Sequence, residues 1–149
     1  MHSVMSNDFD VVIVTLTPDE YSPSGYWTTY FEGASSIKYA LDNALKKPKL
    51  VIWVSSTRVY RDSNEDTVDE STPLVNSNEY VKALISAENK INSYDGKTVI
   101  IRFSGIYGER RCHLLHSVLN GFGGNLSSDT WTNRIHIEDC VRFIAFLVD

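Results

Sequence analysis

Hydroxyl side chains follow one of the most apolar stretches of the sequence. The stretch VIWVSSTRVY (51–60) begins like a buried strand and then places Ser55, Ser56 and Thr57 in succession. These hydroxyls could take part in a reaction, but Ser and Thr also commonly end strands by bonding nearby backbone groups. A hydrolase nucleophile is excluded, because no Gly-x-Ser-x-Gly turn surrounds either serine.

Three further side chains are candidates for a site. Tyr80 shares the apolar stripe of a predicted helix with Leu84 and Ala87, which suits a core tyrosine and a general acid equally. Arg102 and Tyr107 lie in RFSGIYG and could line a substrate cleft. The alternative for these two is an ion-paired arginine and a packed tyrosine at a strand end.

The histidines do not predict a metal site. His113 and His116 stand three residues apart on a predicted helix, which permits metal ligation geometrically. No carboxylate stands at helical spacing on that face, and two histidines alone seldom make a site. We therefore interpret both as surface histidines.

Apolar runs and helical stripes alternate along the chain. The predicted strands are FDVVIVTLT (9–17), which we expect to be buried on both faces, LVIWVSS (50–56) and TVIIRF (98–103). Helices are predicted from about Tyr26 to KKPK (46–49), from Glu79 to DGK (95–97), over 110–120 and over EDCVRFIAFLVD (138–149), with NRIHI (133–137) extended. Loops or turns are predicted over 61–78, 104–111 and 121–125. This alternation predicts one α/β domain over 1–149 with a parallel sheet.

The composition and charge of the chain limit the kinds of protein it can be. The 149 residues, 42% hydrophobic and 22% charged, are ordinary for one globular domain, and the net charge of −5 argues against a nucleic-acid or anionic-membrane surface. No apolar run approaches the ~20 residues that span a bilayer. The start, MHSVMSNDFD, lacks the pattern of a signal peptide. Cys112 and Cys140 form neither a disulfide framework nor a zinc motif, so we expect a reduced, cytoplasmic protein.

Five segments occur in an order typical of one enzyme family. They are VSSTRVY (54–60), VDESTPL (68–74), EYVKALISAE (79–88), IRFSGIYGER (101–110) and RIHIEDCVRFI (134–144). In this order they resemble the extended short-chain dehydrogenase/reductase family, the NAD-dependent epimerase/dehydratase group. The resemblance implies a Rossmann-like parallel sheet with flanking helices, here the region of strands 4, 5 and 6. It also implies NAD or NADP as cofactor and a sugar nucleotide or similar hydroxy or keto compound as substrate.

The same resemblance assigns site residues. Ser56, four residues before Tyr60, falls at the family's catalytic Ser or Thr, and Tyr80 falls at its catalytic tyrosine. Substrate-cleft positions fall on Thr57, Arg102 and Tyr107, and cofactor positions on Thr15, Leu16, Thr17, Ser55, Ser104 and Gly105. The comparison makes His136 structural or cleft-lining. It makes Asp139 a carboxylate favoured by a helix dipole rather than a metal or proton-relay group, so we expect no metal.

One departure from the family lies at the catalytic pair. The family places a lysine four residues after its tyrosine, about one helical turn away, where the ammonium favours the phenolate. That position is Leu84 here. Lys82 cannot replace the lysine, because two residues along a helix is ~200° around it.

A second departure concerns the cofactor turn. The chain has no GxGxxG or GxxGxxG after a strand, the motif that holds a pyrophosphate at a helix N-terminus. Relative to the family, the sequence resembles a middle portion that lacks the Gly-rich first half and the C-terminal lobe. The strand at 11–16 would then be an apolar edge, and we expect self-association through this edge or through helix faces.

Two classes of function follow. The first is an NAD(P)-dependent epimerase, dehydratase or reductase, impaired because Leu84 replaces the lysine. The second is a catalytically silent Rossmann-like binding or interaction module, or an inactive fragment. The substrate and the choice between NAD and NADP are not predicted.

Overall fold

A computed structural model describes residues 8–60, 67–76, 78–109, 116, 118–121 and 132–149. The chain divides into two compact units, Met1–Arg102 and Phe103–Asp149, and each is described here by itself. The predicted helix over 110–120 and the turn over 121–125 lie largely outside the described residues, as do Cys112 and His113.

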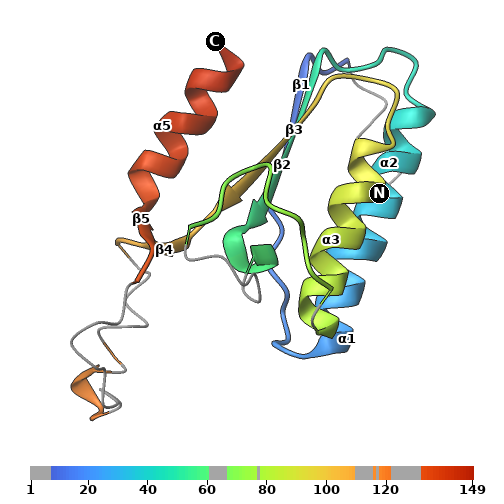
Figure 1. Ribbon diagram of the computed structural model, residues 1–149. Helices are drawn as coiled ribbons and strands as arrows, with labels where there is room; N and C mark the ends of the chain where they lie inside the picture. Colours follow the sequence, from blue (N-terminus) through green and yellow to red (C-terminus); the bar gives the residue numbers. More distant parts are fainter. Residues whose placement is uncertain (1–7, 61–66, 77, 110–115, 117, 122–131) are drawn as a thin grey trace. The chain divides into compact units, whose positions relative to one another are not determined.

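The first unit is built on a parallel sheet of three strands, β1 (Val11–Val14), β2 (Leu50–Ser56) and β3 (Thr98–Phe103), in the order β1-β2-β3 (Figure 1). Val11 pairs with Leu50 and Val14 with Trp53, in a parallel register. The bounds of β2 and β3 confirm the predicted strands, and the predicted α/β class with a parallel sheet is confirmed.

Burial differs between the central strand and the edge strand. In β2, the first four residues and Ser55 are buried, as expected for a strand covered on both faces. In β1, Val12 and Val14 pack into the core but Ile13 is 46% exposed. The prediction that β1 is buried on both faces is therefore wrong, because alternate side chains of an edge strand point to opposite faces and only one of them is covered.

One predicted helix is three consecutive helical segments, α1 (Pro23–Tyr26), a π-helix η2 (Trp27–Glu32) and α2 (Gly33–Asp42). The Ser22 side chain caps the start by accepting a hydrogen bond from the Gly25 N–H at 3.0 Å. The helix ends at Asp42, earlier than the predicted KKPK segment.

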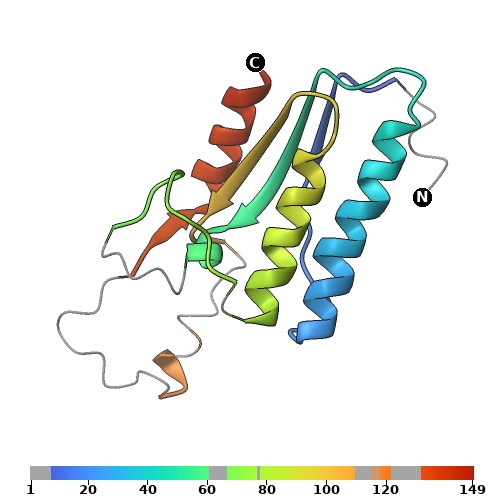
Figure 2. The same cartoon turned by 45° about the vertical axis from the view of Figure 1, so that its right-hand side comes forward.

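Helix α3 (Glu79–Asn92) begins where the sequence predicts. The Oδ1 atom of the Asn78 side chain accepts hydrogen bonds from the N–H groups of Tyr80 and Val81, both at 3.1 Å, which caps the first turn. Helices α2 and α3 lie side by side on one face of the three-stranded sheet (Figures 1 and 2). Core residues shared by these elements are Val14, Ala34, Leu41, Val51, Trp53, Ala87 and Ile91.

The second unit contains a two-stranded parallel sheet and one long helix. Strand β4 (Gly105–Tyr107) pairs with β5 (Arg134–His136), and α5 (Ile137–Val148) follows β5 directly. The loop predicted over 104–111 therefore contains a short strand. In the described part of the chain, no helix is long and apolar enough to cross a membrane.

A substitution at Leu84 tests whether this side of α3 is packed in the core or faces a polar cleft. Leu84 is 1% exposed and packs with Val59 and Val81. We expect Leu84→Lys to lower the free energy of unfolding by about 3–5 kcal/mol, because an ammonium there is buried without a partner. Urea unfolding measures this, and Leu84→Met, which keeps the volume, should cost less than about 1.5 kcal/mol. A lysine tolerated as well as the methionine would show that position 84 opens to a polar cleft.

Candidate functional site

The candidate site lies at the carboxyl ends of β1 and β2. Thr15, Leu16 and Thr17 follow β1, and Ser55 and Ser56 end β2. Thr15 and Thr17 are exposed, whereas the Leu16 side chain packs against the core. Ligands of open α/β sheets bind outside the carboxyl ends of the strands, so these residues occupy the expected edge.

Ser55 is bonded to a buried carboxylate. Its hydroxyl donates a hydrogen bond of 2.5 Å to Oε1 of Glu88 on α3. Ser55 is 7% exposed and Glu88 is 2% exposed. This hydroxyl therefore ties β2 to α3.

Arg102 on β3 neutralises the same carboxylate. Its Nε donates to Glu88 Oε1 at 3.1 Å and its Nη2 to Oε2 at 2.7 Å, which is a two-point ion pair. Nη1 donates to the Tyr60 hydroxyl, and the guanidinium carbon lies 5.0 Å from the Tyr60 ring centroid. The hydrogen bonds to Glu88 raise the pKa of Arg102 above its ordinary value. The geometry is the ion-paired arrangement considered as the alternative to cleft lining.

Ser56 and Thr57 lie where β2 turns into the 3₁₀ helix η3 (Thr57–Tyr60). The Ser56 hydroxyl oxygen accepts a hydrogen bond of 3.2 Å from the Arg58 backbone N–H, which satisfies the first turn of η3. Ser56 and Thr57 are both partly exposed. Both can therefore contact a ligand at this edge, whereas Ser55 is buried.

A tyrosine–arginine cluster of Tyr21, Tyr26, Arg58 and Tyr80 lies beside them. The Arg58 guanidinium carbon is 5.3 Å from the Tyr21 ring centroid, 5.5 Å from that of Tyr26 and 4.9 Å from that of Tyr80. Nη1 of Arg58 donates to the Tyr21 hydroxyl and, at 3.2 Å, to the Tyr26 hydroxyl. The rings of Tyr21 and Tyr80 are stacked at 5.5 Å, and Tyr26 meets Tyr80 edge-on at 4.9 Å.

Tyr21, Tyr26 and Arg58 are not among the site residues predicted from the sequence. Spacing along the chain gives no sign that Tyr21 and Arg58 meet, since 37 residues separate them. One signal was available. A tyrosine-containing segment, PDEYSPSGY, directly follows the first predicted strand, and Arg58 directly follows the hydroxyls of the second. In a parallel sheet both positions lie at the same edge.

Position 84 on α3, where the family pattern has a lysine, is Leu84 in this chain. Leu84 is buried in the core, and Lys82 lies on the surface, where its Nζ pairs with Glu79 at 2.6 Å. Lys82 therefore lies on a different side of α3 from Leu84, as the helical spacing predicts. The cation that contacts the Tyr80 ring is Arg58, from a different element.

The remaining predicted site residues belong to the second unit. Gly105 pairs with Arg134, and a Cβ at 105 would meet the far end of the flexible Arg134 side chain, which can move aside. Ser104 precedes β4, and Tyr107 is half exposed with its ring 5.2 Å from that of His136. His136 Nδ1 accepts a hydrogen bond from the Glu138 N–H at 3.3 Å and caps α5.

The first turn of α5 contains Asp139, which confirms its predicted place at a helix N-terminus. Within the described ranges, no cluster of three or more His, Cys, Asp or Glu side chains has the arrangement of a metal site.

The described residues hold no cradle for a dinucleotide pyrophosphate. Residues 15–22, between β1 and α1, contain no glycine. Gly25 is the first glycine after β1, and a side chain there would collide with the Glu20 carbonyl oxygen, so its place reflects tight turn packing. The hydroxyls of Thr15, Thr17 and Ser56 suit the polar end of a ligand at this edge, but the residues described do not fit a whole dinucleotide.

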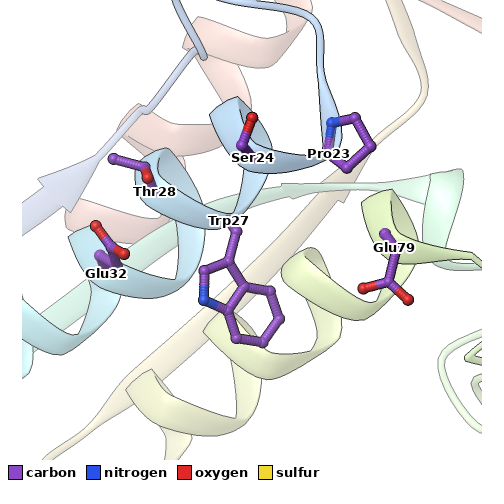
Figure 3. Close-up of a pocket in the computed structure, with 6 residues that line it drawn as sticks. All are labelled: Pro23, Ser24, Trp27, Thr28, Glu32 and Glu79. Carbon is purple, nitrogen blue, oxygen red and sulfur yellow. The ribbon is translucent and has the colours of Figure 1, made fainter.

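A cavity of about 390 Å³ lies between α1, η2 and the first turn of α3 (Figure 3). It is lined by Pro23, Ser24, Trp27, Thr28, Glu32 and Glu79. The figure shows the Trp27 indole extending from η2 toward α3. None of the predicted site residues lines this cavity.

Solved structures similar to this chain are NAD-dependent epimerase/dehydratase proteins. A structure from Methylobacillus flagellatus, assigned as an NAD-dependent epimerase/dehydratase, is 30% identical with a TM-score of 0.76 and covers 99% of this chain and 50% of that one. UDP-glucuronic acid 4-epimerase from Bacillus cereus, in complex with UDP-glucuronic acid and NAD, is 20% identical with a TM-score of 0.78, covering 99% and 52%.

The human epimerase family protein SDR39U1 (isoform 2) with NADPH is 16% identical with a TM-score of 0.79, covering 99% and 55%. The chain thus spans about half the length of these structures. A scan against protein-family models gives no match, and neither does a search of curated proteins.

The buried carboxylate gives a test of what holds the site together. We expect Glu88→Gln to lower the free energy of unfolding by about 2–4 kcal/mol, because Arg102 loses its charge partner inside the protein. The matched control is Glu79→Gln on the same helix, where an exposed pair with Lys82 is worth less than about 1 kcal/mol. Chemical denaturation of the three proteins makes the comparison. Equal losses for the two variants would contradict the assignment of Glu88 as the tie between strands and helix.

Proposed function

We propose that this chain belongs to the NAD-dependent epimerase/dehydratase group of the short-chain dehydrogenase/reductase family, acting on a sugar nucleotide or a similar hydroxy or keto compound. The observation that carries the proposal is the 30% identical structure that covers 99% of the chain. The order of the five sequence motifs supports it. Arg58 connects two of the residues concerned, because its backbone N–H bonds the Ser56 hydroxyl and its guanidinium carbon lies 4.9 Å from the Tyr80 ring centroid.

In this proposal each residue has a role set by its surroundings. Ser56, partly exposed at the end of β2, orients a substrate hydroxyl, and Tyr80 is the residual acid or base. Thr57 borders the cleft, while Arg102 acts through Tyr60 and Glu88 rather than by direct contact. Tyr107 remains a proposed cleft residue. A nicotinamide cofactor would supply hydride chemistry, and Thr15 and Thr17 are the exposed side chains after β1 that would contact it.

Catalysis is proposed to be impaired. The lysine that favours the phenolate in the family is replaced by Leu84, which lies in the core and carries no charge. The second candidate function is a catalytically silent binding or interaction module. The observation in its favour is that the described residues contain no pyrophosphate cradle.

Titration with NADH and NADPH separates the two candidates. The enzyme proposal expects saturable enhancement of nicotinamide fluorescence and an increase in melting temperature with one of the two cofactors, because a ligand that binds only the folded state stabilises it. Ser56→Ala should keep the binding, since Ser56 is assigned to the substrate. No response to either cofactor would contradict cofactor-dependent activity in this chain and leave the binding module as the better account.

We also propose that the chain self-associates through the edge of β1. Among the described residues β1 pairs with β2 alone, and Ile13 exposes an apolar side chain on this strand. Sedimentation velocity at micromolar concentration should show a dimer, and Ile13→Lys should shift it toward monomer. A folded wild-type monomer at these concentrations would contradict the proposal.

A further inference from the structure

The guanidinium of Arg58 has no acidic partner among the described residues. Arg58 follows the carboxyl end of β2, and its Nη1 donates to the hydroxyls of Tyr21 and Tyr26. Tyr26 stays neutral, because burial raises its pKa to about 12. These hydroxyls therefore bond the cation, but no carboxylate in the described part of the chain balances its charge.

Arg102 on the neighbouring strand β3 shows how the same type of side chain is neutralised in this unit. Its guanidinium bonds both carboxylate oxygens of Glu88, at 3.1 and 2.7 Å. Arg58 and Arg102 are both partly exposed. A cation that is partly withdrawn from water is normally paired with an anion. The charge of Arg58 therefore leaves a place for an anion that the described residues do not fill.

Two nitrogens of the Arg58 guanidinium remain for such an anion. Nη1 uses its two hydrogens on the tyrosine hydroxyls, and within the described ranges neither Nε nor Nη2 has an acceptor. Nε is also buried, and a buried donor without an acceptor is destabilising. Nε and Nη2 form an edge of the guanidinium plane that can bind a carboxylate through two parallel hydrogen bonds. A carboxylate on this edge would supply both missing acceptors.

Three aromatic rings hold the Arg58 guanidinium in place. Its carbon lies 5.3 Å from the Tyr21 ring centroid, 5.5 Å from that of Tyr26 and 4.9 Å from that of Tyr80. A cation that is already held in one position loses little freedom when an anion binds. The ring surfaces also exclude water around the charge, which strengthens its attraction for an anion.

Arg58 also contacts the two residues assigned to the substrate hydroxyl that reacts. Its backbone N–H bonds the Ser56 hydroxyl, and its guanidinium lies against the Tyr80 ring. An anion on Arg58 would therefore lie close to the reacting carbon, which fits an acidic group on the sugar or keto compound itself. The diphosphate of a sugar nucleotide fits this place less well, because it is attached at the anomeric carbon, which has no free hydroxyl.

We propose that Arg58 binds a carboxylate of the substrate, so that the site takes an acidic hydroxy or keto compound such as a sugar acid. This inference rests on the proposed function and narrows its substrate class. Ser56 and Tyr80 keep the roles given there, and Arg58 is a binding residue that takes no part in proton transfer. Because the chain as a whole carries a net charge of −5, a local cation is needed to attract an anion to this edge.

An NMR titration of the whole chain tests the proposal without any cofactor. The probes are D-glucuronate, D-glucose, which lacks the carboxylate, and inorganic phosphate, all at constant ionic strength. We expect D-glucuronate to shift the Arg58 Nε–H signal saturably, with an apparent Kd at least about tenfold below that of D-glucose, because a charge-assisted two-point bond is added. The Nε–H of Arg102, already bonded to Glu88, should not move and is the internal control.

Two substitutions at position 58 complete the test. Arg58→Met should raise the apparent Kd for D-glucuronate, followed on the Thr57 amide, at least about tenfold, whereas Arg58→Lys, which keeps a cation, should raise it less. The matched control is Arg142→Met on α5, an exposed residue paired with Glu138, and it should change nothing. If Arg58→Met fails to fold, the wild-type comparison of the three probes decides. Equal affinities for D-glucuronate and D-glucose, tighter binding of phosphate, no shift with any probe, or binding indifferent to Arg58→Met would overturn the proposal.

The outcome is separable from that of the proposed function. Failure to bind NADH and NADPH would reject the enzyme, while the titration still reports on the carboxylate site. If a cofactor binds and a sugar acid is turned over, Arg58→Met should lower kcat/KM at least about tenfold, mainly by raising KM, and leave kcat/KM for the neutral counterpart unchanged. Turnover that prefers the neutral compound would overturn the carboxylate assignment and leave the enzyme proposal standing.

Discussion

The first unit depends on one buried carboxylate. Glu88 projects from α3 and receives a hydrogen bond from Ser55 on β2 and two from Arg102 on β3. A buried charge is costly unless it is paired and hydrogen-bonded, so helix and strands are held in the one arrangement that satisfies it. Arg102 then bonds Tyr60 and extends the network to the end of η3. The carboxyl edge of the sheet is positioned by this network.

The network also decides which polar groups remain for a ligand. Ser55 and Arg102 are committed to Glu88. Ser56 and Thr57 stay partly exposed, and Arg58 turns toward the tyrosines that follow β1. At the end of β2, Ser55 is thus part of the buried network, whereas Ser56 and Thr57 can meet a ligand.

The sequence predicted those helices and strands whose burial leaves a clear pattern of apolar residues. The run LVIWVSS is apolar because β2 is the central strand, and Asn78 marks the start of α3 because its side chain caps the first turn. The departure at Leu84 followed from the family resemblance, which places a lysine at that position. The exposure of Ile13 was not predicted, because an apolar run does not distinguish an edge strand from a central one. The π-helical turn at Trp27–Glu32 has no periodic signature of its own.

The polar partnerships required the structure. Nothing in the sequence assigns Glu88 a polar partner, yet Ser55 and Arg102 meet on it from 33 and 14 residues away. The same holds for Tyr21 and Arg58. Contacts between residues distant along the chain depend on how the strands pair, so they cannot be predicted from the spacing of residues in the sequence.

A double-mutant cycle on Glu88 and Arg102 tests the central claim most directly. The single variants Glu88→Gln and Arg102→Met and the double variant are compared by chemical denaturation. If the pair holds the edge together, the free energies of unfolding will be non-additive by about 1–3 kcal/mol, with the double variant less destabilised than the sum of the single ones. Losses that add within about 0.5 kcal/mol would contradict the account.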